Sequence, residues 1–257
     1  MNFIDTHTHL DAAEFDADRD EVMARARQAG VGKVFIPAID LASVERVTSL
    51  CDAYPGFAFP MIGLHPEEVR GDYKEVLSRM RQMIGPRFIA VGEVGLDYYW
   101  SREFEKEQVE AFDEQVRWAV EYRKPLMLHC RKAQHEMVRV LKRYEKDLCG
   151  GVFHCFTGNE TEAEELLGFE GFALGIGGVL TFKNSRLPEV LANAVPLGRI
   201  VLETDSPYMA PVPVRGRRNE SSFVGYVLER VAQSYGVTPE TVAGATNDCV
   251  RRIFGDC

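Results

Sequence analysis

The stretch PLMLH, residues 125–129, is a short apolar run that ends in a histidine. Short apolar runs of this kind, many of them β-branched, recur along the chain and alternate with longer amphipathic stretches. Such runs are typical of buried strands. We predict eight strands, at residues 2–8, 33–37, 57–62, 88–92, 125–129, 151–154, 171–175 and 199–203.

The segments between the predicted strands have helical character. Apolar residues recur at the spacing of one helix face in residues 112–120 and 137–148, and Gly30 follows residues 18–29 as a helix stop would. Residues 220–235 and 238–254 also have helical patterns. Strands joined by helical crossovers form a parallel sheet, and eight of them predict an α/β fold, a (β/α)8 TIM-type barrel. An open, doubly wound sheet is the alternative.

The composition predicts one folded domain that spans residues 1–257. This is about the length of one barrel, and 46% of the residues are hydrophobic and 27% charged. No apolar run reaches the roughly 18 residues that span a bilayer. Residues 1–5 lack the basic and apolar segments of a signal peptide, so we expect a cytoplasmic protein without membrane contact.

The charge and the cysteines exclude several classes of function. The chain has 30 basic and 39 acidic side chains, and this net charge of −9 argues against non-specific coating of duplex DNA. Phosphate substrates stay possible, because bound cations can reverse the sign of the local field. The six cysteines have no C-x-x-C spacing, so we expect neither a disulfide framework nor a thiolate metal site.

Side chains that can bind metal ions fall at the ends of the predicted strands. His7 and His9 lie two residues apart, so both can project from the same face of the first strand. Barrel active sites lie at the C-terminal ends of strands. A histidine or carboxylate side chain at such a place would cost several kcal/mol to bury without a partner. The fourth, fifth, sixth and eighth predicted strands end at or near Glu93, His129, His154 and Asp205.

These residue types suit a metal-dependent hydrolase. Neutral imidazoles and carboxylates are good ligands for Zn, Mn or Fe. Glu93 could bridge two ions about 3.5–4 Å apart, which would lower the pKa of a water and stabilise charge on the reacting oxygens. Asp205 could bind one ion and also accept the proton from the attacking water. We therefore predict two divalent metal ions, with Glu93 and Asp205 as the catalytic residues.

Seven stretches that contain or flank the predicted ligands form a recognisable pattern: FIDTHTHLD (3–11), IGLHPEE (62–68), AVGEVGLDYY (90–99), KPLMLHCRKA (124–133), GVFHCFTGN (151–159), LETDSPYMAP (202–211) and RGRRNE (215–220). Through these stretches, the chain resembles the TatD family of metal-dependent hydrolases, within the amidohydrolase-like barrels. They run from residue 3 to residue 220 in the order typical of that family. Two places depart from the family pattern: Ser221 stands where proline is usual, and residues 247–254 follow the usual ending only loosely.

The resemblance implies a TIM-type barrel that hydrolyses phosphodiester bonds in DNA, as a deoxyribonuclease with 3′-to-5′ exonuclease character. It implies that one ion is bound by His7, His9, Glu93 and Asp205. The other would be bound by Glu93, His129 and His154. It also adds Mg to Mn and Zn among the ions expected, so the identity of the metal stays open.

Other residues near the predicted mouth are candidates for substrate binding. We expect His65 to end the third strand and assign it to phosphate binding or proton relay; a hydrogen-bonded structural histidine is the alternative. Aromatic rings at 98–100 could stack on a base, and we take Tyr98 as the representative; packing over the rim is the alternative. Lys183 and Arg215, on the loops after strands seven and eight, could contact a phosphate.

Three further side chains receive structural assignments. His135 lies inside a predicted helix and is expected on the surface. Cys130 and Cys155 each follow a predicted ligand, so alternation along a strand should turn them away from the barrel interior. We assign both thiols to packing.

The sequence thus predicts a hydrolase acting on DNA, with single strands or 3′ ends as its partners and no inferable obligate protein partner. A first rival is cleavage of another ester at the same site, such as that of D-aminoacyl-tRNA. A second rival is a metal-binding barrel without catalytic activity. The cationic loops favour phosphates over other esters, and the intact ligand set favours an enzyme.

Overall fold

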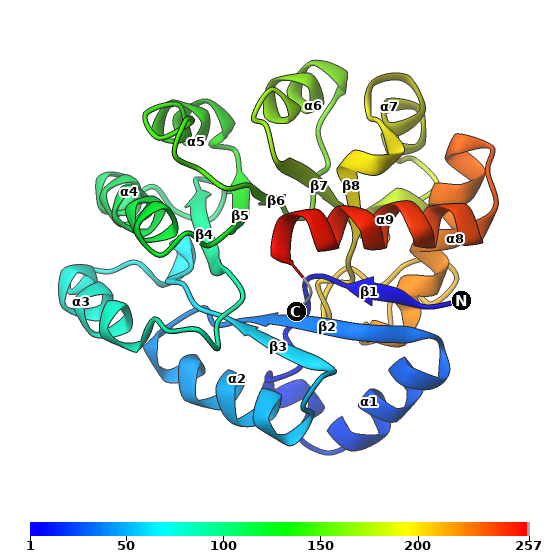
Figure 1. Ribbon diagram of the computed structural model, residues 1–257, viewed down its shortest axis with the longest axis horizontal. Coiled ribbons are helices and arrows are strands. Elements are labelled where there is room, and N and C mark those ends of the chain that lie inside the picture. Colours follow the sequence, from blue (N-terminus) through cyan, green and yellow to red (C-terminus); the bar gives the residue numbers. More distant parts are fainter. Residues whose placement is uncertain (256–257) are drawn as a thin grey trace.

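The eight predicted strands are all present in the structure, a computed structural model that describes residues 1–255. They alternate with helices, which form a ring around the strands (Figure 1). The strands are β1 (Phe3–Asp5), β2 (Val31–Pro37), β3 (Ala58–Met61), β4 (Val91–Asp97), β5 (Leu126–Arg131), β6 (Gly151–Phe153), β7 (Phe172–Ile176) and β8 (Ile200–Leu202).

Several helices begin and end at residues whose side chains or backbone favour these positions. Asp40 and Asn159 accept hydrogen bonds from backbone N–H groups in the first turns of α2 and α6. Gly30 follows α1 with a φ of 99°, a left-handed conformation that favours glycine. The α-helices are α1 (Arg19–Gln28), α2 (Leu41–Ala53), α3 (Tyr73–Met83), α4 (Glu105–Glu121), α5 (Gln134–Leu141), α6 (Glu160–Leu167), α7 (Leu187–Ala194), α8 (Val224–Tyr235) and α9 (Pro239–Phe254).

The strands are parallel and follow one another in chain order. They form a sheet of β1-β2-β3 and a sheet of β4-β5-β6-β7-β8. Single bridges join the two sheets: Ile62 pairs with Val91, and Thr8 pairs with Ser206. The first and last strands are therefore neighbours, which an open doubly wound sheet does not allow. The predicted (β/α)8 barrel is confirmed, with its hydrogen-bonded ladder interrupted at these two seams.

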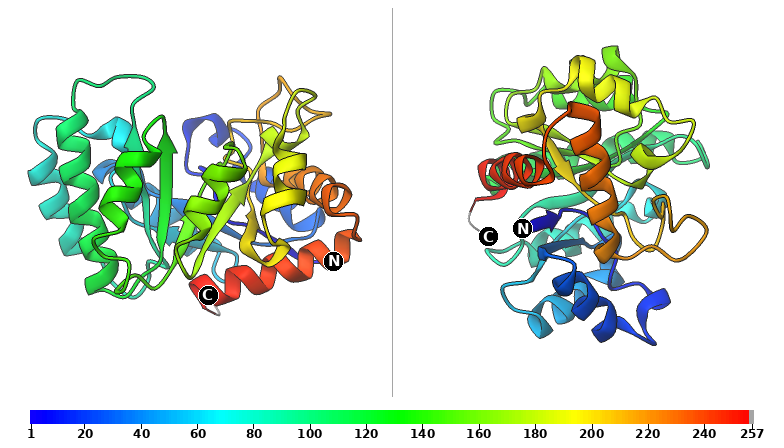
Figure 2. Two further views of the ribbon diagram at one scale, coloured as in Figure 1. Left: turned by 90° about the horizontal axis from the view of Figure 1, so that it is seen from above. Right: turned by 90° about the vertical axis from the view of Figure 1, so that its right-hand side faces the viewer.

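Apolar side chains fill the N-terminal end of the barrel interior. They form one buried cluster with residues of α9, which runs across that end of the strands (Figure 2, left). Because successive side chains of a strand face opposite ways, His129 shares the interior face with Met127 but lies nearer the C-terminal end. The cluster contains Phe35, Met61, Ala90, Met127, Val152, Ala173, Val201, Cys249, Val250 and Ile253.

Several element boundaries differ from the sequence predictions. β4 runs from Val91 to Asp97, so it begins and ends later than the predicted 88–92. β1 ends at Asp5 rather than at residue 8. α5 ends at Leu141, and residues 142–147 form turns. Tyr144 and Leu148 still pack against the core, so their apolar spacing reflects burial of the turns rather than a longer helix.

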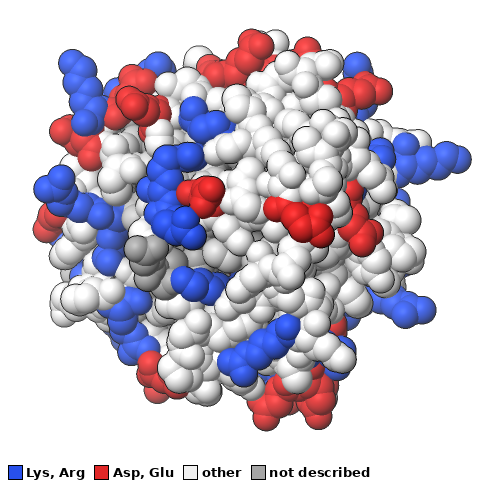
Figure 3. Space-filling view, turned by 45° about the vertical axis from the view of Figure 1, so that its right-hand side comes forward, with Lys and Arg blue, Asp and Glu red and all other residues white. Residues whose placement is uncertain are grey.

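The surface carries both signs of charge. On the face in Figure 3, lysine and arginine side chains lie among aspartate and glutamate side chains. None of the helices within residues 1–255 combines the length and the apolar character that crossing a membrane requires.

Candidate metal centre

The structure brings the six predicted metal ligands together at the C-terminal mouth of the barrel. His7 and His9 follow β1, Glu93 lies within β4, and His129 lies within β5. The last two, His154 and Asp205, follow β6 and β8. The prediction that Glu93 and His129 end their strands is wrong, because both strands continue past them to Asp97 and Arg131.

Atoms of four side chains have the mutual spacing of ligands on one ion. Ligand atoms about 2.1 Å from a tetrahedral ion lie about 3.4 Å from one another. The Nε2 atoms of His7 and His9 are 3.2 Å apart, and Glu93 Oε2 lies 3.2 Å from the former and 3.6 Å from the latter. Asp205 Oδ1 lies 3.7 Å from His7 Nε2 and 3.5 Å from His9 Nε2. These four side chains could therefore hold one ion.

The other carboxylate oxygen of Glu93 faces a second group of imidazoles. Glu93 Oε1 lies 2.9 Å from His129 Nδ1, 3.1 Å from His154 Nε2 and 3.3 Å from His65 Nε2. Glu93 thus stands between two sets of nitrogen atoms, as a bridging ligand requires. His65 lies in this second set, although the sequence analysis assigned it only to phosphate binding or proton relay.

The position of His65 has a local cause. The histidine precedes the short 3-10 helix η2 (Pro66–Glu68) and acts as its cap, because its Nδ1 accepts the backbone N–H of Glu67 at 3.1 Å. The other ring nitrogen, Nε2, faces Glu93 Oε1. His65 does not end a strand, as β3 stops at Met61.

The electrostatics of the site favour ionised carboxylates. Burial raises the pKa of Glu93, but the imidazoles of His65, His7 and His154 outweigh it and hold the pKa well below its usual range. Burial lowers the pKa of His154, but the carboxylates of Glu93 and Glu203 raise it well above its usual value. A divalent ion that binds here would replace protons on the imidazoles and neutralise the carboxylates.

The donor set fits a divalent cation. His7 is fully buried and Glu93 is 2% exposed, and such polar groups are stable inside a protein only when paired or bound to metal. Their ligand atoms fall into overlapping triplets small enough to surround an ion, among them His7–His9–Glu93 and His65–Glu93–His129. Nitrogen and carboxylate oxygen ligands together suit Zn, Mn or Fe.

Comparison with known proteins agrees with this geometry. The family model described as TatD related DNase matches residues 4–255. The chain belongs to the TatD family. It is 35% identical to the uncharacterized metal-dependent hydrolase YabD of Bacillus subtilis, over 97% of this chain and 98% of that protein. It is 34% identical to the 3′-5′ ssDNA/RNA exonuclease TatD of Cronobacter sakazakii, over 97% of each.

A solved structure extends the likeness to three dimensions. The crystal structure of YjjV, a TatD homolog from Escherichia coli, matches this chain with a TM-score of 0.89 and 31% identity. The match covers 98% of this chain and 97% of that one. Membership of the TatD family confirms the predicted enzyme class, a metal-dependent hydrolase.

Sequence reasoning missed two carboxylates that orient the histidines of this TatD chain. The predicted strand 88–92 leaves Asp97 on the loop that follows it, but Asp97 ends β4 and its Oδ2 lies 3.0 Å from His129 Nε2. Glu203 is fully buried; its Oε1 lies 3.3 Å from His154 Nδ1 and accepts the N–H of Cys155 at 2.5 Å. Such partners fix ring orientation and raise ligand basicity. Alternation from Val201 could have indicated that Glu203 faces the interior.

The structure does not support Tyr98 as a stacking residue. Its side chain is part of the hydrophobic core and only 8% exposed, so its ring has no open face for a base. The packing alternative holds for Tyr98, whereas Tyr99 and Trp100 are 50% and 64% exposed.

The cationic loops lie where the sequence predicts them. Lys183 and Arg215 are both exposed, and the Arg215 guanidinium lies 4.1 Å from the centre of the Phe182 ring. This contact places the loop after β8 beside the loop after β7. Arg218 instead pairs with Asp18 at 2.7 Å, which fastens the end of the long loop to α1.

The remaining assignments concern residues that we expected to be structural. His135 is exposed on α5, as predicted. Burial raises the pKa of the Cys130 and Cys155 thiols to about 12, so both stay protonated. Protonated, partly buried thiols fit the predicted packing role.

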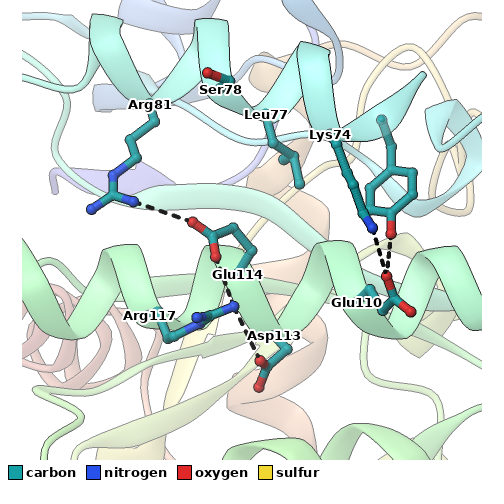
Figure 4. A pocket seen from close by; sticks show the side chains of 9 residues that line it. Lys74, Leu77, Ser78, Arg81, Glu110, Asp113, Glu114 and Arg117 are labelled. Carbon is teal, nitrogen blue, oxygen red and sulfur yellow. Dashed lines mark hydrogen bonds and ion pairs between the residues drawn. The ribbon is translucent and has the colours of Figure 1, made fainter.

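A cavity of 470 Å³ lies outside the metal centre, between α3 and α4 (Figure 4). Its basic side chains are held by acidic neighbours within the same cavity. Arg81 lies 3.4 Å and Arg117 2.7 Å from Glu114, and Lys74 lies 3.5 Å from Glu110. Because these charges are already paired, the cavity is a poor site for a charged substrate.

Proposed function

We propose that this TatD-family enzyme is a divalent-metal-dependent phosphodiesterase that hydrolyses DNA and removes nucleotides from the 3′ ends of single strands. The observation that carries the proposal is the position of Glu93 between two sets of nitrogen and oxygen atoms with the spacing of metal ligands. The choice of DNA and of the 3′ end is supported by the relative named a 3′-5′ ssDNA/RNA exonuclease.

The two sets of side chains would hold two ions, with Glu93 in both sets. His7, His9 and Asp205 complete the first set, and His129 and His154 complete the second, with His65 adjacent. We infer that the ions are Mg, Mn or Zn. Two such ions would lower the pKa of a water and offset charge on the attacking and leaving oxygens.

Asp205 is the residue best placed to take the proton from the attacking water. Burial raises its pKa, but a hydrogen bond from His9 and the charges of His154 and His7 lower it below its usual value. Its carboxylate is therefore ionised and able to accept a proton. The side chain of Asp205 is 18% exposed while that of Glu93 is 3% exposed, so only Asp205 is readily reached from the mouth.

The proposal is tested by a substrate panel on the purified full-length chain. DNA strands labelled at the 5′ end should shorten progressively from the 3′ end, more rapidly when single-stranded than in a blunt duplex. A chelator should stop the reaction, and Mg, Mn or Zn should restore it. Asp205→Asn serves as the matched inactive variant.

A misacylated D-aminoacyl-tRNA in the same panel separates the alternative. Release of the amino acid without cleavage of DNA would replace the proposed substrate with a carboxylic ester at the same site. Failure to cleave any ester with any of the metals would remove the proposed activity altogether.

A further inference from the structure

Two exposed aromatic rings stand beside the metal centre without a role in it. Tyr99 is 50% exposed and Trp100 is 64% exposed, although large aromatic side chains are usually buried. Their rings meet edge to face, with centres 4.9 Å apart. They follow directly after β4, the strand that carries Glu93. An aromatic pair at this place offers an open ring face to a substrate in the mouth.

The pair is held in place by a side chain that also contacts the metal centre. Asp97 Oδ1 accepts the backbone N–H of Tyr99 at 2.8 Å and that of Trp100 at 3.4 Å. The other oxygen of the same carboxylate lies 3.0 Å from His129 Nε2. One carboxylate therefore fixes the distance between the aromatic pair and a predicted metal ligand.

A cation completes the group. Arg131 lies two residues after His129 in β5, and its guanidinium carbon lies 3.6 Å from the centre of the Tyr99 ring and 5.2 Å from that of Trp100. Among residues 1–255, it forms no ion pair with a carboxylate. Since Arg131 covers the Tyr99 ring, Trp100 is the ring with the larger open face. The charge of Arg131 stays available for a phosphate.

We propose that Trp100 and Tyr99 form a stacking platform for an unpaired nucleobase next to the cleaved bond, with Arg131 binding the adjoining phosphate. Stacking on aromatic rings tolerates any base, because every base has a π face. In a duplex these faces are covered by neighbouring base pairs, so the platform selects single strands. The inference rests on the proposed function, since it names the form of nucleic acid that the same site takes.

Binding to short DNA strands in the presence of a chelator tests the platform without cleavage. The ligands are an oligothymidylate and an abasic strand of equal length, which carries the phosphates but no bases. Trp100→Ala should weaken binding of the oligothymidylate about tenfold, the effect of losing one stacked base, and leave the abasic strand unaffected. Arg131→Gln should weaken binding of both strands, because its charge acts on phosphate.

Fluorescence gives a direct readout of stacking. The chain has two tryptophans, and Trp118 is only 1% exposed. Quenching by the oligothymidylate but not by the abasic strand should therefore come from Trp100 and vanish in Trp100→Ala. Tyr122→Ala, which removes an exposed ring at the far end of α4, is the matched control.

Hydrolysis of bis(p-nitrophenyl) phosphate separates this inference from the proposed function. This small diester needs the metal centre but carries no nucleobase, so its hydrolysis by the wild-type enzyme tests the metal centre independently of strand binding. Equal loss of binding to base-bearing and abasic strands, or no loss to either, would overturn the platform even if the diester is cleaved. An enzyme that binds strands through Trp100 but cleaves no diester would instead overturn the proposed function.

Discussion

Replacing Glu203 by glutamine should weaken metal binding at the set that contains His154. Glu203 is fully buried, and its Oε1 lies 3.3 Å from His154 Nδ1. Its negative charge favours a proton on the nearby Nδ1 of His154, which leaves the Nε2 lone pair free for an ion. Glutamine keeps the size of the side chain and can still accept the N–H of Cys155, but it loses the charge.

The expected magnitude follows from this role. Loss of a partner that orients a metal-bound histidine costs about 10- to 100-fold in metal affinity, or about 1.4–2.8 kcal/mol. The loss should fall on one of two binding steps, because Glu203 contacts His154 and none of the other five predicted ligands directly among the described residues. Competition with a chromophoric chelator resolves the two steps.

The control for this experiment is Glu145→Gln, which removes a surface carboxylate beside Lys142. It should bind both ions as the wild type does. If Glu203→Gln also binds both ions within threefold of the wild type, Glu203 does not tune His154 and the reasoning is refuted.

Three further variants or conditions test other parts of the structure. Asp205→Asn should lower kcat by about 10²–10⁴ in steady-state assays while metal analysis still finds bound ions; full activity would remove Asp205 as the proton acceptor. Gly175→Ala should lower the free energy of unfolding, measured with urea, by about 1–3 kcal/mol, because its Cβ would lie 2.2 Å from Glu203 Oε2. Gly244→Ala adds a Cβ in open space and should not lower that free energy. Burial lowers the pKa of His129, but bonds to Asp97 and Glu93 raise it to about 9, so a proton competes with the ion below that pH. Apparent metal affinity should therefore rise between about pH 6 and 8, and a flat profile would contradict this competition.

The parts of the fold that follow local periodicity could be predicted from the sequence. Runs such as Leu126–Leu128 mark a strand on their own, and alternation from Met127 indicates that His129 faces the interior. The metal-binding types of the side chains at successive strand ends then indicate a shared site. Both inferences need only neighbours in the chain.

The parts that depend on distant contacts could not be predicted. In β4 the register against β5 shifts between Val91 and Val94, so simple alternation does not tell which way Glu93 points. Asp97 reaches His129 only because β4 continues farther than its apolar run. Tyr98 and Tyr99 are chemically alike neighbours, and only the tertiary packing decides that the first is buried and the second exposed.

The central claim is that Glu93 lies between two divalent ions at the mouth of the barrel. The most direct test is an anomalous difference map from a crystal of the full-length chain grown with manganese. We predict two peaks about 3.5–4 Å apart, each within bonding distance of a different Glu93 oxygen. A single peak, or peaks that do not contact Glu93, would contradict the claim.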